Sequence, residues 1–181
     1  MLRYAVVGSG AVGCFYGIRL AHAGADVQFL MRSGAEDVRE HGLDLTSPEG
    51  DLHLDDVAVA ADWSELRPCD VLIVAVKATA NADVLAHLAV HAERLLGPGS
   101  GILLAQNGIG AEPAYAAVAP GRDVLGGLAF LCAQRTGPRS VAHLDFGALT
   151  IGAHAPDDAP GGITGLMRGI EEDLSAARTP V

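Results

Sequence analysis

The sequence has few aromatic residues and far fewer basic than acidic ones. Aromatic side chains make up 4% of the 181 residues, and 12 Lys and Arg stand against 22 Asp and Glu, for a formal net charge of -10. Nucleic-acid binding depends on basic side chains that displace phosphate counterions and on aromatic rings that stack on bases. An acidic surface is also repelled by anionic membranes. The composition therefore argues against nucleic acid and membranes as partners.

Long apolar segments are missing as well. The longest run, residues 69–76, is interrupted by Asp70 and is far shorter than the roughly 20 residues that a membrane-spanning helix needs. Residues 1–7 are typical of a strand and contain no basic region followed by a cleavage site. We therefore expect a cytoplasmic protein.

Cysteine is rare, and its spacing matches neither a metal site nor a redox motif. The three cysteines, Cys14, Cys69 and Cys132, are expected to be reduced and largely buried thiols. His87 and His91 are four residues apart on a predicted helix, a spacing that suits a metal ion. No third ligand lies near them in the sequence, so we predict no metal site.

The chain alternates short apolar runs with amphipathic segments, which is typical of an α/β fold. A strand at 2–7, a helix at 11–23 that ends before Gly24, and a strand at 26–31 form a β-α-β unit of about thirty residues. Further strands are predicted at 71–76, 101–106 and 124–132, and further helices at 33–41, 81–96, 111–118 and 163–177.

Antiparallel pairing is expected in two places. Alternating residues over 43–60 predict a hairpin or meander around a turn at 47–50. Segments 141–146 and 148–151 are expected to form a closing pair joined at Gly147. Ser33 is expected to cap the helix that follows it.

A glycine-rich motif lies between the first strand and the first helix. Residues Gly8, Ser9, Gly10, Ala11, Val12 and Gly13 match G-x-G-x-x-G in the context that dinucleotide-binding folds require. Gly8 permits the tight turn, Gly10 lets the backbone approach a pyrophosphate, and Gly13 allows close helix packing. The helix N-terminus adds unpaired N–H groups and a partial positive charge.

The motif and the element order together predict a Rossmann-type fold. It is an α/β, doubly wound and mostly parallel sheet with antiparallel additions at the late strands. The alternative for the motif is a strand–helix turn that binds no ligand.

Arg32 stands near the end of the second strand, where NAD-binding sites usually carry an acidic residue for the ribose 2′-hydroxyl. The first carboxylate after it is that of Glu36. A guanidinium pairs well with a 2′-phosphate, which a carboxylate would repel. The sequence therefore favours NADP(H) over NAD(H), unless Arg32 merely points into solvent.

Lys77 and Asn107 each follow an apolar strand directly. Ligands of open parallel sheets bind beyond the carboxyl ends of the strands. Lys77 could therefore contact a ketone oxygen or a substrate carboxylate, and Asn107 the nicotinamide ribose or the substrate. The alternatives are a solvated lysine and an asparagine that only forms a turn.

In their order along the chain, these motifs resemble the N-terminal part of the ketopantoate reductase (2-dehydropantoate 2-reductase) family. The resemblance is carried by residues 8–17, 24–32, 70–78, 106–110 and 141–152. It implies that NADPH delivers hydride to the ketone carbon of 2-dehydropantoate, a 2-keto acid, on the route to pantothenate and coenzyme A. It also implies that the glycine loop holds the pyrophosphate and Arg32 the 2′-phosphate, with Lys77 and Asn107 on the nicotinamide and substrate side.

The resemblance further implies a second, all-helical domain whose first helix carries the general-acid lysine. The sequence stops at Val181, where that helix is expected, and Lys77 is its only lysine. We therefore predict a dinucleotide-binding domain at 1–155 and, at 156–181, a spacer and terminal helix leading to an absent C-terminal helical domain. Such a chain would bind NADP(H) with little or no reductase activity. Its uncovered apolar face would favour self-association into a homodimer.

Two other functions stay open. The chain could be the cofactor domain of a related dehydrogenase that acts on another 2-keto acid or on a phosphorylated substrate. It could also be a nucleotide-binding module without enzymatic activity.

Overall fold

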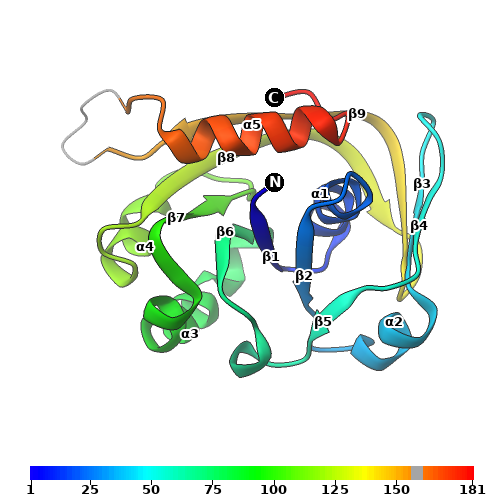
Figure 1. Ribbon diagram of the computed structural model, residues 1–181, viewed down its shortest axis with the longest axis horizontal. Helices are drawn as coiled ribbons and strands as arrows, with labels where there is room; N and C mark the ends of the chain where they lie inside the picture. The colour runs from blue at the N-terminus through cyan, green and yellow to red at the C-terminus, as the bar shows by residue number, and fades with distance from the viewer. Residues whose placement is uncertain (156–160) are drawn as a thin grey trace.

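The computed structural model describes residues 1–155 and 161–181, and within them one sheet of nine strands carries the fold (Figure 1). The strands are β1 (Arg3–Val7), β2 (Asp26–Leu30), β3 (Leu43–Thr46), β4 (Leu52–Leu54), β5 (Ala58–Ala60), β6 (Cys69–Val74), β7 (Leu96–Leu104), β8 (Asp123–Arg135) and β9 (Ser140–Ala153). The α-helices are α1 (Ala11–His22), α2 (Ala35–His41), α3 (Asn81–Leu95), α4 (Glu112–Val118) and α5 (Gly165–Ala176). Short 3-10 helices lie at η1 (Trp63–Glu65) and η2 (Ala78–Ala80).

Six neighbouring strands are parallel, in the spatial order β5-β2-β1-β6-β7-β8. The chain starts at β1, moves outward through β2 to β5, then crosses back to β6 and continues in the opposite direction. This is the strand order of a doubly wound dinucleotide-binding sheet, with its switch point between β1 and β6. The predicted Rossmann-type fold is confirmed.

Antiparallel strands extend the sheet beyond β8. β9 pairs antiparallel with β8 and parallel with β3, which in turn pairs antiparallel with β4. The expected hairpin around residues 47–50 is therefore present as β3 and β4, whereas β5 joins the sheet beside β2. Figure 1 shows the sheet curling so that α1 lies between the parallel strands and the edge formed by β3, β4 and β9.

The predicted strand pair joined at Gly147 is wrong, because β9 runs through this position without turning back. Phe146 and Gly147 have φ angles of 64° and 126°, and the pairing with β8 shifts between Phe130 and Leu131. Gly147 therefore marks a β-bulge in β9, which bends the strand. Pairing with β8 continues on both sides of the bulge.

The helices cover the sheet on both faces. α1 and α5 pack with one set of strand side chains, and α3, α4 and η1 pack with the other. The two faces of the sheet carry separate hydrophobic cores, and adjacent strand residues such as Val6 and Val7 pack into different ones. This explains why the parallel strands are apolar at nearly every position.

The terminal helix α5 belongs to the first of these cores. Leu166, Ile170 and Leu174 lie four residues apart on one helical face and are buried against it. The buried Asp173 carboxylate accepts hydrogen bonds from the backbone N–H of Leu2 and the hydroxyl of Tyr4, both at 2.8 Å. The predicted spacer before this helix falls largely on residues 156–160, which lie outside the described residues.

The start of α2 differs from the expectation that Ser33 caps it. The N-cap is Gly34, with a φ of 75°, and no side chain bonds to the helix start within the described part of the chain. Because glycine enters the left-handed region without strain, the turn into the helix falls one residue later than predicted.

No helix among the described residues is long and apolar enough to span a membrane.

Candidate functional site

The candidate site residues meet at the carboxyl edge of the parallel sheet. β6 pairs with β7 so that Val74 lies opposite Leu104. Lys77 and Asn107 each lie three residues beyond these partners and are exposed. Val7 of β1 lies opposite Val74, so the glycine loop begins at the same edge. The sequence placed all three at strand ends, and the register brings those ends side by side at the switch point.

Two glycines of the loop are required by the fold itself. Gly8 has a φ of 105°, and a Cβ there would lie 2.6 Å from the backbone carbon of Ala75. A Cβ on Gly13 would overlap the carbonyl oxygen of Gly8. A larger residue at Gly8 would displace the segment that follows β6, and one at Gly13 would push the first turn of α1 away from the glycine loop.

Gly10 differs, because its surroundings are open. A Cβ on Gly10 would meet no described atom within 4 Å, and its backbone is extended, with a φ of -78°. Gly10 is the N-cap of α1, no side chain caps this end within the described residues, and the first turn carries no acidic residue. The N-terminus of α1 thus has no side-chain cap among the described residues and has open space beside Gly10, which together suit a pyrophosphate.

Arg32 lies beside this loop in a cavity of about 190 Å³ lined by Gly8, Ser9, Arg32, Ser33, Trp63 and Asp83. Its side chain is 78% exposed, and Nη1 lies 3.4 Å from Oδ2 of Asp83 in the first turn of α3. An exposed pair at this distance contributes about 1 kcal/mol or less, so the guanidinium is readily released to another anion. The sequence did not indicate Asp83, which lies 51 residues away and reaches Arg32 only through the fold.

Asn107 lines a larger cavity, of about 600 Å³, whose other walls include Gln106, Ile109, Glu112, Leu128 and Thr150. Gln106 fixes the loop from behind: its Nε2 donates to the Val76 carbonyl oxygen at 2.9 Å and to Asn81 Oδ1 at 2.8 Å. The Tyr115 hydroxyl donates to the same Asn81 oxygen at 3.0 Å. This network ties the segment before Lys77 to the segment before Asn107.

Neither side chain is held in place by the rest of the described chain. Lys77 forms no ion pair, and the Asn107 amide no hydrogen bond, with residues 1–155 or 161–181. Both remain available to a ligand.

The two helical histidines pack against the indole of Trp63. His87 and His91 lie nearly parallel to it, with ring centroids 5.3 and 6.4 Å away. Among the described residues, no group of three or more His, Cys, Asp or Glu is arranged to hold a metal ion.

The expectation of three largely buried cysteines is wrong for Cys132. Cys14 and Cys69 are buried, and burial raises their thiol pKa to about 11 and about 12, so both stay protonated at neutral pH. Cys132 is exposed because side chains alternate along β8, and its neighbours Leu128 and Phe130 point to the same outer face.

This outer face carries an apolar patch formed by Leu128, Phe130 and Phe146. Each side chain is more than half exposed, and the two phenylalanine rings are 4.4 Å apart. Leu128 also lines the cavity beside Asn107. Contiguous apolar surface of this kind marks contact sites in soluble proteins.

The predicted self-association stays a prediction, and this patch is where it can be tested. We expect Phe130→Ser to shift the chain toward monomer in sedimentation velocity, because it removes the centre of the patch. Val90→Ser on α3, also an exposed apolar residue, is the matched control. Slower labelling of Cys132 at high protein concentration would support burial of the patch. A wild-type chain that is monomeric at all concentrations contradicts the prediction.

Comparison with known proteins identifies relatives along nearly the whole chain. The family model described as ketopantoate reductase PanE/ApbA matches residues 4–156. A 2-dehydropantoate 2-reductase of Nostoc sp. is 39% identical over 179 residues, which cover 97% of this chain and 54% of that protein. One from Halobacterium salinarum is 31% identical over 84% of this chain and 50% of its own length. The chain therefore spans about half the length of the curated relatives it matches.

Solved structures of 2-dehydropantoate 2-reductases also match nearly the whole chain. The 2-dehydropantoate 2-reductase of Geobacter metallireducens superposes with a TM-score of 0.86 at 35% identity, over 98% of this chain and 56% of that one. A D-mandelate dehydrogenase solved with NADH and anilino(oxo)acetate reaches 0.81 at 19% identity, which shows a shared fold alone.

Proposed function

Because the chain belongs to the ketopantoate reductase family of NAD(P)-dependent oxidoreductases, we propose that it is the NADP(H)-binding part of a 2-dehydropantoate 2-reductase. The observation that carries the proposal is the open space over Gly10 at the uncapped start of α1. Arg32 follows β2 on one side of β1 and shares a cavity with Gly8. Lys77 follows β6 on the other side of β1. These residues fit an extended anionic dinucleotide that crosses the switch point.

Each residue then has a distinct role. The N–H groups of the first turn of α1 bind the pyrophosphate, and Arg32 pairs with the 2′-phosphate. Lys77 presents its ammonium to the ketone oxygen or the carboxylate of a 2-keto acid, while Asn107 orients the nicotinamide ribose or the substrate. The bound cofactor supplies the hydride that reduces the ketone.

We propose that this chain alone turns over little or no substrate. The support is its coverage of its relatives, 54% for the Nostoc protein, together with Lys77 being its only lysine. We assign Lys77 to positioning of the substrate, and we propose that a different group acts as the general acid. On this proposal, residues 1–155 and α5 act as the cofactor-binding part of the catalytic unit.

Trp63 provides a direct test, because it is the only tryptophan of the chain and lines the cavity with Arg32. We expect energy transfer from Trp63 to the reduced nicotinamide on titration with NADPH, and a weaker affinity for NADH. Addition of 2-dehydropantoate to the NADPH complex should cause little or no loss of NADPH absorbance.

A Trp63→Phe variant, followed by calorimetry, separates binding from its fluorescence signal. Equal affinity for both cofactors would contradict the assignment of NADP(H), and binding of neither would contradict the proposed function as a whole.

A further inference from the structure

A basic side chain from the far end of β8 reaches the glycine loop. Arg135 is the last residue of β8, and its Nη1 donates to the carbonyl oxygen of Ser9, 126 positions earlier in the chain. The same Nη1 lies 3.2 Å from the Sγ of Cys14, and the Cys14 thiol also contacts the Ser9 oxygen, at 3.4 Å. The Ser9 carbonyl oxygen therefore accepts from two side chains.

The guanidinium of Arg135 is fixed by its own turn. Its Nε donates to the carbonyl oxygen of Gly137 at 3.0 Å, and its Nη2 donates to that of Pro138. With these two nitrogens engaged, Nη1 has a set direction. A planar guanidinium held in this way keeps its remaining donors in one plane and loses little entropy on binding.

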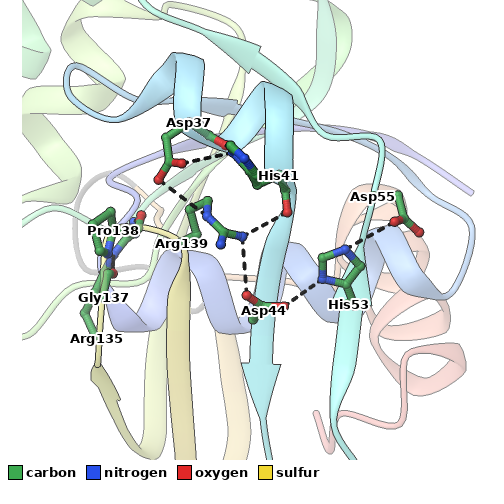
Figure 2. Close-up of polar contacts among 9 residues, drawn as sticks. All are labelled: Asp37, His41, Asp44, His53, Asp55, Arg135, Gly137, Pro138 and Arg139. Atoms are coloured by element: carbon green, nitrogen blue, oxygen red, sulfur yellow. Dashed lines mark hydrogen bonds and ion pairs between the residues drawn. The ribbon is translucent and has the colours of Figure 1, made fainter.

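The turn itself is anchored to two other elements (Figure 2). Arg139 Nη1 donates to the carbonyl oxygen of His41 at 2.9 Å, and its Nε lies 3.4 Å from Asp37 Oδ2. Arg139 also lies 3.5 Å from Asp44, whose other oxygen is held by His53 Nδ1 at 2.7 Å. The β8–β9 turn is therefore tied to α2 and β3, and it presents Arg135 from a supported position.

We propose that Arg135 is a positioning residue for the dinucleotide, an inference that rests on the proposed function. The peptide unit is planar and trans, so the carbonyl of Ser9 and the N–H of Gly10 point in opposite directions. By bonding to this carbonyl oxygen, Arg135 fixes the peptide unit so that the Gly10 N–H points away from the Arg135 guanidinium. It also keeps the carbonyl dipole from turning toward the pyrophosphate and adds a positive charge behind the loop.

On the proposed function, the loop contacts the pyrophosphate, which NADPH and NADH share. A change in the loop should therefore affect the affinity for both cofactors equally. We expect Arg135→Gln to weaken the binding of both cofactors by the same factor, roughly tenfold or more, the scale of a lost hydrogen bond to a charged group. Arg135→Lys keeps the charge and a single donor nitrogen, so it should retain part of the affinity. The amide signal of Gly10 in an ¹⁵N-labelled sample should shift in both variants.

Arg139→Gln is the matched control, since it removes the same charge from the same turn without touching Ser9. It should lower the unfolding temperature yet change cofactor affinity less than Arg135→Gln. If Arg135→Gln does not fold, Arg135→Lys decides: a loss of roughly threefold or more for both cofactors supports the proposal, and wild-type affinity overturns it.

A folded Arg135→Gln chain with wild-type affinity overturns the inference alone. A wild-type chain that binds neither cofactor overturns the proposed function instead.

Discussion

Gly10→Ala should leave the protein folded and strongly weaken its binding of dinucleotides. The added methyl group would enter the open space over the start of α1, where no described atom lies within 4 Å. The backbone at Gly10, with a φ of -78°, accepts alanine without strain. Replacing glycine also lowers the entropy of the unfolded chain, which offsets the poorer N-cap quality of alanine. The free energy of unfolding should therefore change by about 1 kcal/mol or less.

The bound state of Gly10→Ala is expected to differ from the free state, because the methyl group would enter the space that we propose for a phosphate oxygen of the cofactor. Overpacking of this kind costs about 1–3 kcal/mol, or roughly 5- to 150-fold in affinity. Thermal unfolding and Trp63 fluorescence titration, made on the same sample, measure the two effects separately. Wild-type affinity in a folded Gly10→Ala chain would show that the pyrophosphate lies elsewhere.

Gly13→Ala is the informative counterpart, because its methyl group would overlap the Gly8 carbonyl oxygen. Alanine is the better helix former by about 1 kcal/mol, yet backbone atoms must move to admit it. We expect a net loss of unfolding free energy and a lower unfolding temperature without any ligand present. The two glycines of one motif are thus expected to act through different states of the protein.

The sequence was sufficient for the parts of the fold that depend on neighbouring residues. Strand β1, the glycine loop and helix α1 lie close together in the chain, and their periodicity and glycines determine both the unit and its position at the switch point. The strand ends before Lys77 and Asn107 were found for the same reason. Local sequence patterns therefore predicted the strand-end positions of these residues, whereas their binding roles stay predictions.

The errors arise where distant segments override local signals. Gly147 has the local character of a turn, but pairing with β8 on both sides keeps β9 continuous. Asp83 and Arg135 carry no motif, since each meets its partner across at least 51 residues. The exposure of Cys132 could not have been predicted from the sequence, because Leu128, Phe130 and Cys132 form an alternating apolar set that normally faces a core.

Arg32→Ala should separate the two cofactors. A guanidinium bonded to a 2′-phosphate contributes about 1.5–3 kcal/mol, so NADPH affinity should fall roughly 10- to 150-fold while NADH affinity stays nearly unchanged. Arg67→Ala is a matched control, because Arg67 pairs with Asp26 at 2.8 Å at the start of β2, the opposite end of the strand. An equal loss in both variants would indicate a long-range effect of charge, and unchanged NADPH affinity in Arg32→Ala would contradict the assigned role.

Asp83→Asn should change the same preference in the opposite direction. In the free protein its carboxylate lies 3.4 Å from Arg32, and a bound 2′-phosphate would have to displace it and remain close to it. Removing the negative charge should therefore raise NADPH affinity several-fold, on the scale of about 1 kcal/mol for an exposed pair. The ribose 2′-hydroxyl of NADH, in contrast, can donate a hydrogen bond to the Asp83 carboxylate. The Asp83→Asn variant should therefore bind NADH more weakly than the wild-type chain does. On our proposal, the opposing charges of Arg32 and Asp83 in one cavity would together set the cofactor preference, and each variant removes one of the two charges.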